Sequence, residues 1–188
     1  MEHRPSPEVG IHTRIAELRD HLEITRGHLR HVVDAVPAGH GEWSPPSGGW
    51  TVAEVVHHLA RIEAMITGLF VKMVGSAREG GLGPEVDNTL QLDSFHGYRV
   101  HNRKHRVTAP ERGTPDTGIA LATAWSALDA SRADLLRALE EADGLALGAI
   151  SYPHAQLGEM SMYQWVAFVG FHETRHAAQI EEITASLS

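Results

Sequence analysis

Residues 168–180 read FVGFHETRHAAQI, and the periodicity of this stretch decides the fold that the chain is expected to adopt. Its larger apolar residues and its two histidines recur at spacings of three and four, the period of one face of an α-helix. The pattern extends to both sides and comprises Trp165, Val169, His172, His176, Ile180 and Ile183. The stretch therefore predicts a long amphipathic helix with His172 and His176 on its apolar face, one turn apart.

The two histidines give this face a chemical meaning beyond packing. A polar ring that is buried without a partner costs free energy, so each imidazole needs a bonding partner. Two imidazoles at positions i and i+4 also form a common helical half-site for a divalent metal ion. The pair therefore raises the question whether another segment supplies a third ligand.

Three further segments show the same helical period. They cover 8–36, 51–75 and 117–141. At the start of the second helix, Thr51 and Glu54 have the spacing of a capping box, which makes Glu54 a helix cap rather than a general base. The helix that contains the opening stretch is expected to start at Ser161, a plausible N-cap, and to continue to the C-terminus.

The segments between these helices are rich in glycine and proline. The connection over 76–117 is long, with room for one short helix within 90–107, and residues 144–158 are expected to form a loop. No segment alternates with a period of two over enough residues to predict a sheet. The sequence thus predicts an all-α fold, a four-helix bundle with a long crossover connection between helices 2 and 3, in a single domain over 1–188.

The second predicted helix contains two adjacent histidines, which its periodicity separates. His58 borders the apolar stripe, with Val55 at i−3 and Ile62 at i+4. His57 has Arg61 at i+4 and is expected on the solvated side. His58 is therefore the candidate for the third ligand.

Two interpretations of His58, His172 and His176 remain open at this point. Each residue is either a core histidine that is hydrogen-bonded to the backbone, or a ligand of one shared metal ion. Helical bundles build metal sites from side chains on facing helices, and a three-imidazole set with an open position is the catalytic type of site. The competing pair His101 and His105 lies among several arginine and lysine residues, which repel a cation.

Composition excludes several functional classes. The chain has 188 residues, no cysteine, fourteen histidines and a formal net charge of −8. The absence of cysteine removes thiolate ligands and cysteine nucleophiles, and the negative charge argues against nucleic acid as a partner. No apolar run approaches the roughly 20 residues needed to span a bilayer, and no signal peptide is recognisable. We expect no membrane association and a cytoplasmic location.

Two stretches of the sequence are similar to the motifs of a known family. Residues 50–59, which read WTVAEVVHHL, resemble the second-helix signature of the DinB/YfiT-like superfamily, with His58 in the ligand position. Residues 172–180, which read HETRHAAQI, resemble its last-helix signature, a pair of histidines four apart followed by Gln-Ile. Residues 157–165 resemble the segment that leads into that helix.

This resemblance implies a four-helix bundle, often dimeric, with a three-histidine site for a divalent metal such as zinc or nickel. Family members with assigned activities include bacillithiol-dependent S-transferases and mycothiol-dependent maleylpyruvate isomerases. The resemblance favours a metal-dependent transferase that uses a low-molecular-weight thiol and a small-molecule substrate. It also favours a homodimer. A metal-dependent hydrolase and a non-enzymatic metal-binding stress-response protein are the alternatives. A fourth protein ligand, such as His57 or Glu173, would favour the last of these.

Three further residues are weaker candidates for a role at this site. His154 and Tyr152 precede the last helix and are placed to reach the mouth of the site. Gln179 lies one turn after His176 and either orients a ligand or is an amide at the edge of the core, the latter being slightly preferred.

Overall fold

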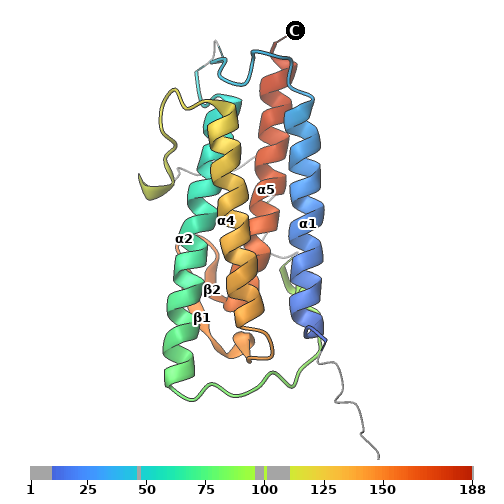
Figure 1. Ribbon diagram of the computed structural model, residues 1–188, viewed down its shortest axis with the longest axis vertical. Coiled ribbons are helices and arrows are strands. Elements are labelled where there is room, and N and C mark those ends of the chain that lie inside the picture. The colour runs from blue at the N-terminus through green and yellow to red at the C-terminus, as the bar shows by residue number, and fades with distance from the viewer. Residues whose placement is uncertain (1–9, 46–47, 96–99, 101–110, 188) are drawn as a thin grey trace, which may run out of the picture.

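Four long helices run side by side along the long axis of the computed structural model, which describes residues 10–45, 48–95, 100 and 111–187 (Figure 1). They are α1 (Thr13–Asp34), α2 (Val52–Glu79), α4 (Leu121–Glu141) and α5 (Met162–Ala185). The predicted all-α four-helix bundle is confirmed. The helix limits differ from the predicted ones by a few residues at most of the ends that the structure describes.

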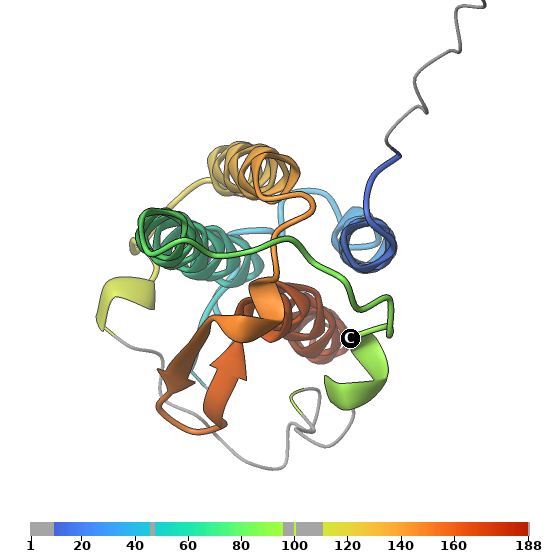
Figure 2. The ribbon, with the colours of Figure 1, turned by 90° about the horizontal axis from the view of Figure 1, so that it is seen from below.

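Seen end-on, the four helices enclose a common core (Figure 2). Helix α5 packs against both α1 and α2, and α2 packs in turn against α4, whereas α1 and α4 contact each other much less. The buried apolar residues fall into two clusters, one at each end of the bundle. On α1, for example, Leu22 belongs to one cluster and Leu29 to the other.

Capping boxes define the first residues of α2 and α5, as the sequence predicts. Thr51 Oγ1 accepts from the Glu54 N–H (3.1 Å), and the Glu54 carboxylate accepts from the Thr51 N–H (2.9 Å). Ser161 and Gln164 exchange the same two hydrogen bonds at the start of α5. Because a cap fixes where each helix starts, it also fixes which side chains face the core.

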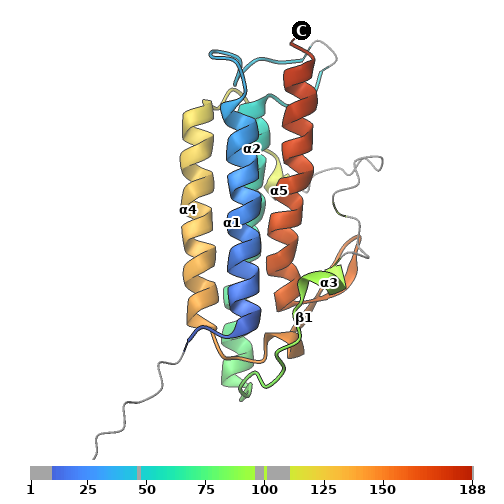
Figure 3. The same ribbon diagram turned by 90° about the vertical axis from the view of Figure 1, so that its right-hand side faces the viewer.

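The long connection after α2 crosses one end of the bundle before it reaches the short helix α3 (Leu92–Phe95), which packs against α5 (Figure 3). Glu85 anchors this segment. Its carboxylate accepts from Arg14 Nη1 on α1 and from the Tyr163 hydroxyl on α5, each at 2.8 Å. The crossover between the second and third long helices is thus present. The pair His101 and His105 lies outside the described residues.

The segment before α5 differs from the expected loop. It contains one 3₁₀ turn, Leu147–Ala149, followed by two antiparallel strands, β1 (Ser151–His154) and β2 (Gly158–Ser161). Each strand has four residues, β1 contains Pro153, and Met160 is fully buried. Strands this short show too little alternation to be predicted from periodicity. None of the described helices is long and apolar enough to cross a membrane.

Helices α1 and α5 approach closely at Gly170. A Cβ atom added there would lie 2.3 Å from His21 Nε2, which contacts the Ala167 carbonyl oxygen at 3.1 Å. An alanine at this position would therefore displace His21 and break that hydrogen bond. By contrast, Gly68 in α2 is exposed, and a Cβ atom added there would meet nothing within 4 Å.

We expect Gly170→Ala to lower the free energy of unfolding by roughly 1–3 kcal/mol, the usual cost of overpacking. Gly68→Ala is the matched control and should raise it by about 0.4–1 kcal/mol, because alanine restricts the unfolded chain. Urea denaturation of both variants measures the difference. Equal stabilisation by the two substitutions would contradict the close helix contact at Gly170.

Candidate metal centre

Three histidines from two helices converge at the interface between α2 and α5. His58 comes from α2, and His172 and His176 come from α5. One ring nitrogen from each lies within 4.8 Å of those of the other two. Within the part of the chain that the structure describes, this is the sole group of three or more metal-binding side chains that come so close together. The three ligands predicted from the sequence are therefore neighbours in space.

Hydrogen bonds set the tautomers of two of these rings. His58 Nδ1 lies 2.6 Å from the Gly113 carbonyl oxygen, which belongs to the 3₁₀ turn Glu111–Gly113. A carbonyl can only accept, so His58 carries its proton on Nδ1 and has its lone pair on Nε2. His176 Nδ1 lies 2.8 Å from Gln179 Oε1, which fixes the same tautomer. A backbone carbonyl or side-chain oxygen on the far nitrogen is the usual outer support of a metal-binding histidine.

The spacing of the ring nitrogens fits a single metal ion. The Nε2 atoms of His172 and His176 lie 3.1 Å apart. Two nitrogens bound to one tetrahedral zinc ion at about 2.0–2.1 Å lie about 3.3 Å from each other. Because His176 Nε2 carries a lone pair, this contact in the metal-free protein is a hydrogen bond that His172 Nε2 donates. His172 becomes a metal ligand through the same nitrogen when its proton moves to Nδ1. The donor set therefore fits a divalent metal that accepts imidazole, such as zinc or nickel.

The surroundings of His58 and His172 favour the neutral imidazole, which is the form that binds a metal. Burial lowers the pKa of His58 below its ordinary value of 6.5, although the hydrogen bond to Gly113 opposes this shift. Burial also lowers the pKa of His172 well below 6.5, and the positive forms of His176 and other nearby bases lower it further. Little competition from protons is thus expected at His58 and His172 near neutral pH.

Aromatic side chains surround the three histidines. The Phe168 ring stacks on His172, with centroids 5.2 Å apart and planes 19° apart, and the Trp50 ring lies 4.8 Å from His58. His154, at the end of β1, lies 5.2 Å from both Phe168 and Trp165. These rings make the wall of the site mostly apolar and limit the access of water.

Comparison with known proteins agrees with this fold. The sequence matches the model of the DinB superfamily over residues 21–180. The chain belongs to the DinB superfamily. A solved structure described as that of TT2238, a four-helix bundle protein, superposes with a TM-score of 0.60 over 89% of this chain and 98% of the other. At 18% sequence identity, that likeness shows a shared fold. No curated protein matches the sequence significantly.

Of the two residues that bond the ligand rings, Gln179 lies in a segment that carries a family signature, whereas Gly113 lies outside both segments. Gln179 of this DinB-superfamily chain contacts the His176 ring, which favours the role of orienting a ligand over that of a core-edge amide. His154 lies one aromatic ring away from His172. Tyr152 contributes its backbone oxygen, which accepts from Trp165 Nε1 at 3.0 Å, while its side chain is exposed.

Two residues adjacent to the ligands in the sequence, His57 and Glu173, are the candidates for a fourth ligand. His57 is buried rather than solvated, contrary to the expectation from its helical neighbours. Its Nδ1 accepts from the Asp116 N–H at 3.1 Å, in the segment that follows the Glu111–Gly113 turn. Glu173 faces away and binds Arg26 and Arg132. Neither residue belongs to the three-histidine group.

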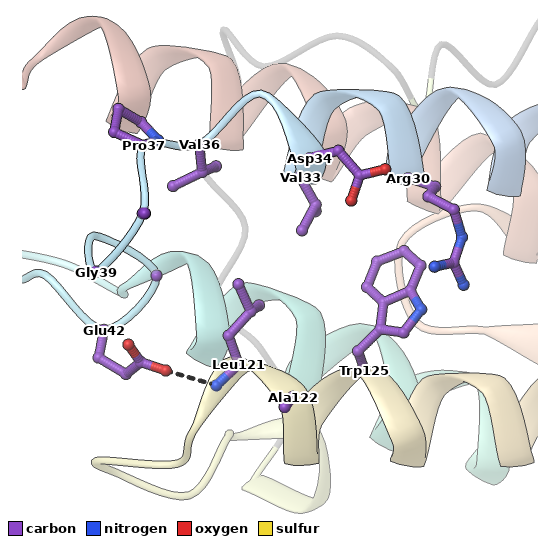
Figure 4. Close-up of a pocket in the computed structure, with 12 residues that line it drawn as sticks. Arg30, Val33, Asp34, Val36, Pro37, Gly39, Glu42, Leu121, Ala122 and Trp125 are labelled. Carbon is purple, nitrogen blue, oxygen red and sulfur yellow. Dashed lines mark hydrogen bonds between the residues drawn. The ribbon is translucent and has the colours of Figure 1, made fainter.

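A separate pocket lies between the end of α1 and the start of α4 (Figure 4). Its volume is about 550 Å³, and none of the three histidines lines it. Two of its three charged groups already have roles, since Glu42 accepts from the Leu121 N–H at 2.7 Å and the Arg30 guanidinium lies over the Trp125 ring. The indole N–H of Trp125 is buried without an acceptor among the described residues, but one donor selects no ligand. The chemistry of the protein therefore points to the histidine cluster.

The hydrogen bonds at the two Nδ1 atoms predict the tautomers of the metal-free protein. Long-range ¹H–¹⁵N spectra of the histidine rings should show His58 and His176 protonated on Nδ1. Replacing Gln179 by Leu removes the acceptor of His176 alone, so His176 should become a mixture of tautomers while His58 serves as the internal control. Protonation of His58 on Nε2 would contradict the geometry.

Proposed function

We propose that this protein is a divalent-metal-dependent enzyme whose reaction is the transfer of a low-molecular-weight thiol to an electrophilic small molecule. The observation that carries the proposal is the convergence of three imidazoles, two of them held in the metal-binding tautomer by Gly113 and Gln179. Three imidazoles with no fourth protein ligand among the described residues are typical of catalytic rather than structural zinc sites.

A divalent metal held there would lower the pKa of a coordinated thiol or water and so supply a nucleophile near neutral pH. The protein has no cysteine, so a sulfur nucleophile has to come from a small molecule. Burial of the site between α2 and α5, behind Trp50 and Phe168, reduces competition from bulk water. An apolar or aromatic electrophile suits these walls.

His154 supplies a hydrogen-bond donor near the site. Its Nδ1 accepts from the Gln156 and Leu157 N–H groups, each at 3.2 Å, so its proton resides on Nε2. Burial lowers its pKa, which favours the neutral form. In the transfer, the sulfur forms a bond to the electrophilic carbon and the leaving group departs with its electron pair. The thiol proton is released to water, which returns a proton to the leaving group, and the Nε2–H of His154 donates a hydrogen bond to the departing group. The homodimer and the cytoplasmic location expected from the sequence stay predictions.

Metal content tests the site itself. We expect wild-type protein to hold about one zinc or nickel ion per chain, as measured by elemental mass spectrometry. His58→Ala and His176→Ala should each lose this ion, because only two imidazoles remain to bind it. His57→Ala is the matched control, since His57 is the buried neighbour of His58 and bonds Asp116 instead; it should retain the metal. Wild-type protein that stays metal-free after zinc and nickel are added would overturn the site.

Thiol conjugation tests the reaction. Metal-loaded protein should accelerate the conjugation of small thiols to a model aromatic electrophile. The rate should fall at least 100-fold in His58→Ala. His154→Ala should lower it about tenfold with the metal retained, because it removes one hydrogen bond worth about 1.4 kcal/mol. Turnover of a model ester without any thiol, abolished by a chelator, would instead assign the site to a hydrolase. Metal binding without either activity would favour the binding-protein alternative.

A further inference from the structure

A second polar cluster lies in the middle of the bundle, and each of the four long helices contributes one charged side chain to it. The four residues are Arg26 of α1, Glu63 of α2, Arg132 of α4 and Glu173 of α5. We refer to them as the four-helix charge cluster. The cluster lies at the level where the two apolar clusters of the core meet, so it interrupts the apolar interior of the bundle.

The charges alternate around this cluster. The Arg26 guanidinium lies 3.0 Å from Glu63 and 2.7 Å from Glu173. Arg132 contacts the same two carboxylates, at 2.5 Å for Glu63 and 3.0 Å for Glu173. Both glutamates are 1% exposed. Every pair of opposite charges therefore joins two different helices, and the net charge of the cluster is zero.

Neighbouring groups form further hydrogen bonds with the side chains of the cluster. Ser131 donates to Glu63 at 2.9 Å, and Thr25 donates to Glu173 at 3.3 Å. Arg132 Nη1 donates to the Leu22 carbonyl oxygen at 2.6 Å. Burial raises the pKa of Glu63, and the two arginines oppose that shift.

Such a cluster contributes little net stability, which points to a different role. The free energy of removing charges from water is nearly as large as the free energy gained from their attraction. A protein in which apolar side chains of similar volume replace a buried ion pair is therefore often equally stable. The best-attested use of buried polar groups is to specify one register or one rotation of packed helices. The cluster specifies the geometry of α2 and α5 because its two glutamates lie on these helices.

These are also the two helices that carry the candidate metal ligands. Glu63 follows His58 by five residues, so the two side chains point about 140° apart around α2. Glu173 is adjacent to His172, which places them about 100° apart around α5. The histidine group and the charge cluster thus occupy different faces of the same two helices, within about 1.4 turns of each other along α2. A contact that fixes the rotation of α2 or α5 at one face therefore also fixes the side-chain positions on the other face of that helix.

The required accuracy is high. An atom roughly 6 Å from a helix axis moves by about 1 Å when the helix rotates by 10°. Ligand distances in metal sites vary by only about 0.2 Å, and functional constellations tolerate roughly 0.5 Å. Apolar packing alone leaves a helix with several rotations about its axis that are similar in energy. The contacts of Arg26 and Arg132 with Glu173 exclude such rotations of α5.

We infer that the four-helix charge cluster is the positioning device of the histidine site: it sets the rotation of α5 against α2 and so brings His172 and His176 to His58. This inference deepens the proposed function and rests on it where metal binding is concerned. Arg26, Arg132, Glu63 and Glu173 act through the histidines and are positioning residues.

The test compares two neutral double variants. Arg26→Met/Glu173→Met removes one charge of each sign, breaks the link to α5 and leaves Arg132 paired with Glu63. Arg14→Met/Glu85→Met is the matched control, because that ion pair is also buried, with side chains 6% and 5% exposed, and joins the crossover to α1 and to Tyr163 at the start of α5. Each variant replaces one arginine and one glutamate that are paired with each other. The first variant also loses the contacts of Arg26 with Glu63 and Asp129 and of Arg132 with Glu173, so it should be the less stable of the two.

Cobalt(II) alone serves as the metal probe, because its visible spectrum reports ligand geometry as well as binding. In Arg26→Met/Glu173→Met we expect cobalt affinity to fall at least tenfold and the spectrum to change. In the control we expect the affinity to stay within about threefold and the spectrum to be that of wild type. Equal losses in both variants, or a wild-type spectrum in the first, would overturn the inference. If the first variant does not fold, Arg26→Lys replaces it in the test. Lysine keeps the charge but cannot contact both carboxylates as the planar guanidinium does, so this variant should still weaken cobalt binding at least threefold.

Histidine spectra of the metal-free proteins separate this inference from the proposed function. The ring ¹⁵N shifts of His58 and His176 should change in Arg26→Met/Glu173→Met and remain those of wild type in the control. If wild-type protein binds no cobalt or zinc, the proposed function fails, while these shifts still decide whether the cluster positions the rings. Unchanged shifts in the first variant would overturn the positioning role whatever the metal result.

Discussion

The contact between α2 and α5 is the interaction on which the rest of the structure depends, because two buried polar assemblies meet across it. On one side, His58 faces His172 and His176. On another, Glu63 and Glu173 share the arginines of α1 and α4. A bundle held by apolar side chains alone would tolerate small rotations of its helices. Here such a rotation would separate Glu173 from Arg26 and Arg132, at a cost comparable to a large part of the stability of a domain.

The sequence predicts the parts of this arrangement that follow from local pattern. Periodicity separates His58 from His57, and the capping boxes of Thr51 and Ser161 mark the starts of both ligand-bearing helices. The spacing of four between His172 and His176 is enough by itself to identify them as a pair on one helical face. These inferences succeed because helical geometry converts positions in the chain into positions on a face.

What the sequence does not predict depends on contacts between distant segments. His57 has charged neighbours on its own helix, yet it is buried because the segment after Gly113 covers it. The role of Gln179 follows from the orientation of one ring, and the strands β1 and β2 are too short to show a period. Arg26 and Glu63 look like surface charges until four helices are assembled. A glutamate beside the apolar stripe of Leu59, Ile62 and Ile66 was the available signal for the charge cluster.

The candidate ligands and the groups that surround them come from different kinds of structural element. The ligands and the charge cluster lie on long, capped helices, which hold their atoms accurately. Groups that lie beside the histidines come partly from irregular or short elements, such as Gly113 in a 3₁₀ turn and His154 at the end of β1. Loops tolerate substitutions and insertions that helices in a packed core do not. A bundle built in this way can keep the geometry of its histidine group while the segments around that group change.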